Sequence, residues 1–171
     1  MFAQTVGVLV AVTYYLTTMR NQNRARQAQV YNNIWNRSTG DSEFLRDRFI
    51  LSSLNWNTYQ EFTALFPWSD RESENTMALF RVGSFLEGLS VLVRENLIDI
   101  RLVAMGNSGL VTDLWYKLRP VIEEVREVSS MPAFFAGTEY LYNEISQYMK
   151  EHPELEIYRY EAEQQRGYMP E

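Results

Sequence analysis

The run MFAQTVGVLVAVTYYLTTM (residues 1–19) contains no charged side chain, and it decides which architecture the sequence predicts. As an α-helix it would extend about 28 Å, close to the roughly 30 Å of hydrocarbon in a bilayer. Gln4 and several threonines make it less apolar than a leucine-rich span. Tyr14 and Tyr15 lie near its end, where aromatic side chains meet the membrane interface, and Arg20 follows. We therefore interpret residues 1–19 as a transmembrane anchor.

Three other interpretations of this run fit the residues less well. A cleaved signal peptide begins with a basic region and ends at a small-residue cleavage site, and the run has neither. A core helix of a soluble domain shows a polar stripe, which residues 6–16 almost lack. An interfacial helix mixes cations with its apolar residues, whereas the first cation here is Arg20.

The segment after the run is basic, and the rest of the chain is acidic. Residues 1–40 carry four arginines and no acid, whereas residues 41–171 carry 12 bases and 22 acids. The positive-inside rule then predicts the N-terminus outside and the body in the cytoplasm of a single-pass cell-membrane protein. Contacts with lipid headgroups are expected from the following residues: Arg20, Arg24, Arg26, Tyr14 and Tyr15.

Small residues recur every fourth position in the predicted span, at Ala3, Gly7 and Ala11. Small residues at this spacing let transmembrane helices approach closely. The pattern predicts packing against other membrane-protein subunits, in a homo- or hetero-oligomer.

The first half of the body predicts helices separated by short turns. The first helix should continue to about residue 36 and stop at RSTGD (residues 37–41), with Gly40 as its terminator. A second helix should start near Asp41. TYQE (residues 58–61) reads as a capping box for a third helix that ends before Pro67, and SDRE (residues 69–72) as a capping box for the longest internal helix.

The second half continues this pattern. Asp99 should cap a short helix closed by a turn at GNSG (residues 106–109). Pro120 should start a new helical segment or kink an old one, and Pro132 fits the first turn of a last helix over residues 133–150. Because no segment alternates with period 2, we predict an all-α fold.

Residues for chemistry are scarce. There is no cysteine, and the single histidine, His152, cannot complete a histidine-based triad or metal motif. GNSG lacks the lysine and strand of a phosphate loop, and the acidic body argues against a nucleic-acid surface. We expect no catalytic, cofactor-binding or metal-binding residue, and no enzyme.

Glu87 is the one charge inside the most apolar segment, SFLEGLSVL (residues 84–92). It either lies on a polar stripe or is buried against an arginine such as Arg119. The apolar start running into RNQNRARQAQ, then FLEGLSVLVRENLID, then LWYKLRPVIEE, resembles an uncharacterised prokaryotic family of short membrane-anchored helical proteins, a domain of unknown function. The resemblance covers about residues 5–150 and implies an anchored bundle without an activity. It implies structural roles for Glu87, Gly88, Trp115 and Pro120.

These observations predict a chain in four parts: an anchor (1–19), a basic juxtamembrane helix extension (20–40), a helical bundle (41–153) and an acidic, aromatic tail (154–171). The expected function is a non-catalytic single-pass subunit or scaffold of a larger membrane protein assembly. Its partners would be membrane lipids and other subunits. The alternative is a soluble helical adaptor whose first helix is buried in an oligomer or in a partner's groove.

Overall fold

A computed structural model describes residues 2–155, without the side chains of residues 2–6 and 9. The predicted all-α class is confirmed, since this range contains helices and no strand. The elements are α1 (Phe2–Gly40), α2 (Ser42–Ser53), α3 (Tyr59–Leu65), α4 (Glu74–Arg94), α5 (Ile100–Leu118), α6 (Ile122–Val128), α7 (Ala136–Glu151) and the short 3-10 helix η1 (Pro153–Leu155).

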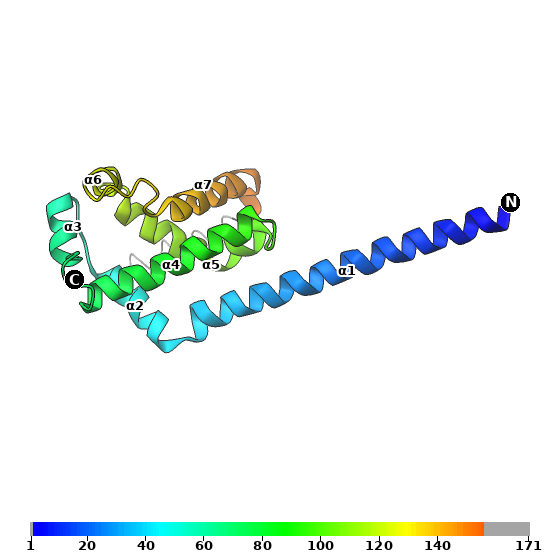
Figure 1. The fold of residues 1–171 in the computed structure, drawn as a ribbon, viewed down its shortest axis with the longest axis horizontal. Coiled ribbons are helices and arrows are strands. Elements are labelled where there is room, and N and C mark those ends of the chain that lie inside the picture. Colours follow the sequence, from blue (N-terminus) through cyan, green and yellow to red (C-terminus); the bar gives the residue numbers. More distant parts are fainter. Residues whose placement is uncertain (1, 156–171) are drawn as a thin grey trace.

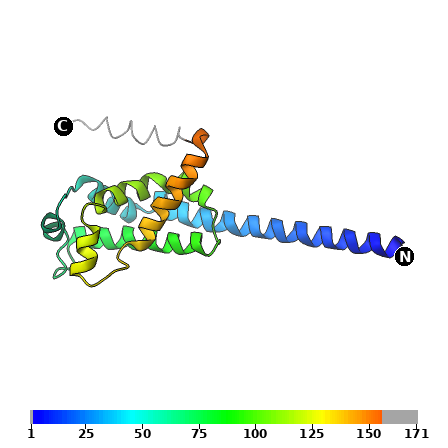
Figure 2. The same cartoon turned by 90° about the horizontal axis from the view of Figure 1, so that it is seen from above.

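The molecule consists of a compact bundle and one long helix that projects from it (Figure 1). α4 packs against both α2 and α7, and α7 also packs on α5. Only the last part of α1 contacts the bundle, where it meets α2 and α5. The N-terminal part of α1 extends away from every other described element in both views (Figures 1 and 2).

The core is built on α4, whose buried residues recur every third or fourth position. Leu79, Val82, Leu86 and Leu89 are each at most 2% exposed. Burial of such side chains contributes about 1.5–3 kcal/mol each relative to exposure, as an upper range. Phe80, on the same helix, is 39% exposed at its surface.

The first helix ends later than predicted, at Gly40 rather than near residue 36. Gly40 does not adopt a left-handed conformation, so it is not the predicted glycine terminator. The break comes from Asp41, whose carboxylate accepts the backbone N–H groups of Glu43 and Phe44 at 3.0 and 3.1 Å. Asp41 thereby caps α2, as the sequence predicts for a second helix that starts there.

One predicted capping box is confirmed and the other is wrong. Thr58 and Glu61 exchange the two hydrogen bonds of a capping box at the start of α3. SDRE does not cap α4, because Asp70 accepts the N–H of Glu72 within a turn that precedes the helix. α4 begins only at Glu74, with Ser73 as its cap.

The predicted turn at GNSG is also wrong, because α5 runs through it without a break. Asp99 does cap this helix, through the N–H of Arg101 at 2.8 Å. Gly106 serves close packing: a Cβ there would lie 2.9 Å from the Tyr31 hydroxyl and 3.4 Å from the Trp35 ring of α1. The glycine allows two helices to cross closely and does not end one.

The two later prolines lie between helices. Pro120 separates α5 from α6, so of the two predicted possibilities it starts a new segment. α7 starts at Ala136, later than predicted from Pro132, after Phe135 in a left-handed conformation with φ of 55°. α7 ends at Glu151 beside His152, as the sequence indicates.

Two helix ends are closed by cations from other helices. The Lys117 ammonium of α5 donates to the carbonyls of Leu51, Ser52 and Leu54, at 2.7, 2.7 and 2.6 Å, where α2 ends. Arg48 of α2 donates to the Ser38 carbonyl near the end of α1, at 3.2 Å. The last carbonyls of a helix have no partner inside it, so the cations complete the hydrogen bonding at these two ends.

Candidate membrane-contacting surface

The projecting part of α1 carries large apolar side chains in solvent. The exposed fraction is 63% for Val8, 64% for Val10, 73% for Tyr14 and 62% for Tyr15. Val12, Leu16 and Met19 are also exposed. Ala11 is exposed as well, and a Cβ added at Gly7 would meet nothing within 4 Å. The exposed apolar surface therefore continues along the described part of this run.

These side chains lie around the helix rather than on one stripe. Successive residues of an α-helix are about 100° apart, so Val8 and Val10 point to nearly opposite sides. Tyr15 returns to the side of Val8 and Tyr14 to the side of Val10, while the exposed Leu16 points about 80° away from Val8. A groove in a partner protein covers one side of a helix, whereas bilayer hydrocarbon surrounds it. The surface is therefore better matched by lipid than by a groove.

The hydroxyl of Thr17 does not require water. The Thr17 hydroxyl donates to the carbonyl of Thr13, one turn earlier, at 2.8 Å. This internal bond satisfies the hydroxyl within the helix, which hydrocarbon requires of any polar group. At least this polar group of the run is therefore compatible with hydrocarbon.

The basic collar, defined as Arg20, Arg24 and Arg26, follows directly. All three are exposed, and none forms an ion pair within the described part of the chain. They extend over about 9 Å of helix. Three arginines next to an apolar surface form an arrangement suited to anionic headgroups.

The junction of α1 with the bundle is closely packed. Ile34 and Ser38 are buried, and Tyr31 and Trp35 lie against Gly106 of α5. Beyond the contact with Ser38, Arg48 lies near Asp113 of α5; burial lowers the pKa of its guanidinium, and the charge of Asp113 opposes this shift. The collar is thus joined to a fixed base.

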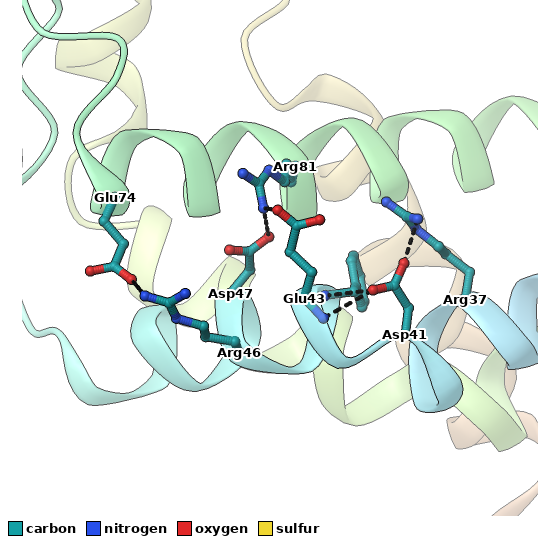
Figure 3. Close-up of polar contacts among 8 residues, drawn as sticks. Arg37, Asp41, Glu43, Arg46, Asp47, Glu74 and Arg81 are labelled. Carbon is teal, nitrogen blue, oxygen red and sulfur yellow. Dashed lines mark hydrogen bonds and ion pairs between the residues drawn. The ribbon is translucent and has the colours of Figure 1, made fainter.

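Ion pairs extend this base from α1 through α2 to α4 (Figure 3). Arg37 of α1 pairs with Asp41. On α4, Arg81 pairs with Glu43 and, at 3.2 Å, with the buried Asp47. A further pair joins Arg46 to Glu74. Because most of these side chains are exposed, packing contributes more than the charges to holding the helices.

Glu87 has a role that sequence reasoning missed. Its carboxylate accepts the N–H groups of Gly137 and Thr138, each at 2.8 Å, and the Thr138 hydroxyl at 3.0 Å. It therefore caps α7 from another helix, while Arg119 is exposed at the end of α5. A signal was present: the residue before α7 is Phe135, which has no side-chain oxygen to cap the helix.

The family resemblance also implied structural roles for Trp115 and Gly88, and these two residues differ in burial. Trp115 is buried and its ring centroid is 6.1 Å from that of Tyr142. Gly88 is exposed, and an added Cβ would meet nothing within 4 Å. The side chain of Ala3 lies outside the described residues, as does the tail from residue 156.

Among the described residues, no group of three acidic, histidine or cysteine side chains is arranged to hold a metal ion. Within the same residues, one helix is long and apolar enough by composition to cross a membrane, and it is α4. Half of its most apolar window is buried in the bundle, as expected of a core helix.

Comparison with protein families gives one match: a model described as a domain of unknown function (DUF4760) matches residues 1–145. Neither the curated proteins nor the solved structures gave a match.

Proposed function

The chain belongs to the family described as a domain of unknown function (DUF4760), and on that premise we propose that it is a non-catalytic, single-pass membrane subunit or scaffold of a larger membrane assembly. α1 would cross the bilayer with its apolar run, and the bundle would present surfaces to other subunits. The N-terminus would lie outside and the bundle in the cytoplasm.

The observation that carries this proposal is the apolar exposure on several sides of α1 before residue 20. A soluble protein rarely exposes a continuous apolar surface of this kind. The internally bonded Thr17 hydroxyl supports a position of the run in lipid hydrocarbon. The collar arginines, which form no ion pair among the described residues, support a position of its end among the headgroups.

The collar also fits the distance between bilayer and bundle. Tyr31, among the first α1 residues packed on the bundle, follows Arg20 by eleven residues, or about 16 Å of helix. A headgroup layer is about 5–8 Å thick on each side of the hydrocarbon. The acidic bundle would therefore lie just beyond the headgroups, with the collar among them.

Membrane fractionation tests the anchor. The full chain should remain with membranes after washes in high salt and in alkaline carbonate. Val10→Arg combined with Val12→Arg should release most of it, because each buried cation costs about 2.5–3.5 kcal/mol at the centre of a span. Phe49→Arg, at a residue 68% exposed on α2, is the matched control and should leave retention unchanged. Release of the native chain by carbonate would instead favour the soluble adaptor.

A further inference from the structure

A cluster of aromatic and methionine side chains, partly buried and partly exposed, lies at the end of the bundle away from the projecting part of α1. We define the distal patch as Trp68, Met77, Phe80, Met131 and Phe134. The Trp68 ring centroid is 6.3 Å from Phe80 and 5.6 Å from Phe134. Met77, Phe80 and Met131 are 38–39% exposed. These residues come from the start of α4 and from the loops before α4 and α7, on the side of α3 and α6 in Figure 1.

The segments that supply the patch, and those next to them in the sequence, are rich in acidic side chains. Residues 67–73 and 122–139 together contain six acids and two arginines. Asp70, Glu72, Glu124 and Glu127 are exposed. Arg126 is not available to a partner, because its side chain is 13% exposed and bonds Glu123, Glu139 and the Phe134 carbonyl. Because Arg71 is the other arginine in these segments, they carry a surplus of negative charge, which we call the acidic rim.

We propose that the distal patch binds a basic segment of a partner protein, which inserts an aromatic or large aliphatic side chain against Met77, Phe80 and Met131. Methionines adapt to varied apolar shapes, and aromatic side chains supply most of the energy at interface centres. Lysines or arginines flanking the inserted residue would face the acidic rim, which favours encounter and orientation. This proposal goes beyond the anchor and does not depend on it, since all its residues belong to the bundle.

Two other occupants fit the charges less well. A second copy of this chain would bring two acidic rims together, and like charges across an interface disfavour it. Anionic lipid would meet the same repulsion. The charge pattern therefore selects a cationic partner.

A defined peptide pair tests the proposal on the full chain in nanodiscs of zwitterionic lipid. The probe is a labelled helical peptide with leucine and phenylalanine on one face and lysine on the other; its twin has glutamate in place of lysine. Fluorescence anisotropy, with empty nanodiscs as blank, should show binding of the lysine peptide that weakens with salt. The glutamate twin should bind about tenfold more weakly or worse. Equal binding of the two peptides would overturn the proposal.

Phe80→Ser and Val91→Ser locate the binding. Both residues are exposed on α4, and Val91 lies about 16 Å further along the helix. Phe80→Ser should weaken the lysine peptide about tenfold, because central aromatic anchors dominate such interfaces. Val91→Ser should change nothing. Thermal melting checks that both variants are folded. Equal effects of the two variants, or self-association of the native chain that Phe80→Ser removes, would refute the assignment.

Discussion

Single charged side chains hold the ends of helices to which they do not belong. Glu87 closes the start of α7, Lys117 closes the end of α2, and Arg48 bonds a carbonyl near the end of α1. Each replaces a cap that the local sequence does not supply. The bundle is therefore fixed at its loops as well as through its core.

Lys117 is one of two lysines beside 14 arginines, and its geometry explains the choice. An ammonium has three donors on one atom, which suits three converging carbonyls, whereas a guanidinium spreads its donors in a plane. Lys117→Met should lower the free energy of unfolding by about 1–3 kcal/mol, and Lys117→Arg should not restore it. Chemical denaturation followed by circular dichroism measures this.

Lys150→Met is the matched control, since that side chain is exposed in the last turn of α7. It should change stability by no more than about 0.5 kcal/mol. If Lys117→Arg were as stable as the native chain, the fit of an ammonium to three carbonyls would not be the reason for the lysine.

Capping residues divide into those that sequence reasoning finds and those it misses. Asp41, Thr58 and Asp99 act on residues two or three positions ahead, so their spacing reveals them. Glu87 acts on residues 50 and 51 positions away, and Lys117 on residues 63 to 66 positions away. No local pattern records such distances, so these roles emerge only from the fold.

Pairs of helices meet at glycines, and α4 with α7 is the tightest case. A Cβ at Gly137 would lie 2.4 Å from the Ser90 hydroxyl and 2.5 Å from the Glu87 carboxylate. At Gly83 it would lie 2.5 Å from the Phe135 ring. Both positions therefore require the absence of a side chain, and Glu87 reaches α7 because of it.

Gly137→Ala and Gly88→Ala form a matched pair of substitutions. Gly137→Ala should cost about 1–3 kcal/mol, because the methyl group overlaps the joint that carries the Glu87 cap. Gly88→Ala, in open space on α4, should be neutral or stabilise by up to about 1 kcal/mol through helix propensity. Denaturation midpoints compare them. Similar effects of the two changes would contradict the described packing.

The basic collar allows a prediction for α1 as an element. Replacing its three arginines by glutamate should scramble the orientation, since each cation near an anionic surface contributes about 1 kcal/mol. Protease protection in sealed spheroplasts reads the result: the native body should be shielded, and part of the variant digested.

A control with the same change in net charge uses exposed arginines of the bundle, namely Arg71, Arg101 and Arg119. Their replacement by glutamate should leave the body shielded, because they lie far along the chain from the apolar run. Digestion of the native body from outside would mean that the proposed orientation is reversed.

At the scale of the whole molecule, the bundle has its own core and needs little from the projecting part of α1. The buried residues of the described chain begin at Ile34. A chain lacking residues 1–19 should therefore be water-soluble and helical, with a melting temperature within a few degrees of the full chain in detergent. Circular dichroism and size-exclusion chromatography measure this. Aggregation of the shortened chain, or loss of its melting transition, would show that the run stabilises the bundle.

The helical class and most helix positions could be predicted because apolar spacing and local caps depend on residues that are close in the sequence. The predicted turn at GNSG failed because glycines signal turns and close helix crossings alike, and only the neighbour distinguishes them. Phe80 lies in the apolar stretch of α4, but the elements that pack on this helix leave its side chain 39% exposed. The sequence alone therefore did not indicate the distal patch, whose residues are brought together by the fold.

The unbroken course of α1 has a mechanical consequence. Because α1 is continuous between Arg20 and Tyr31, a tilt of the apolar run also tilts the part of the helix that joins the bundle. Spans tilt by about 20° on average, and by more where the bilayer is thin. Over about 16 Å of stiff helix, such a tilt moves the base of the bundle sideways by about 5–6 Å. In an anchored chain, bilayer thickness would thereby set where the distal patch stands relative to its neighbours.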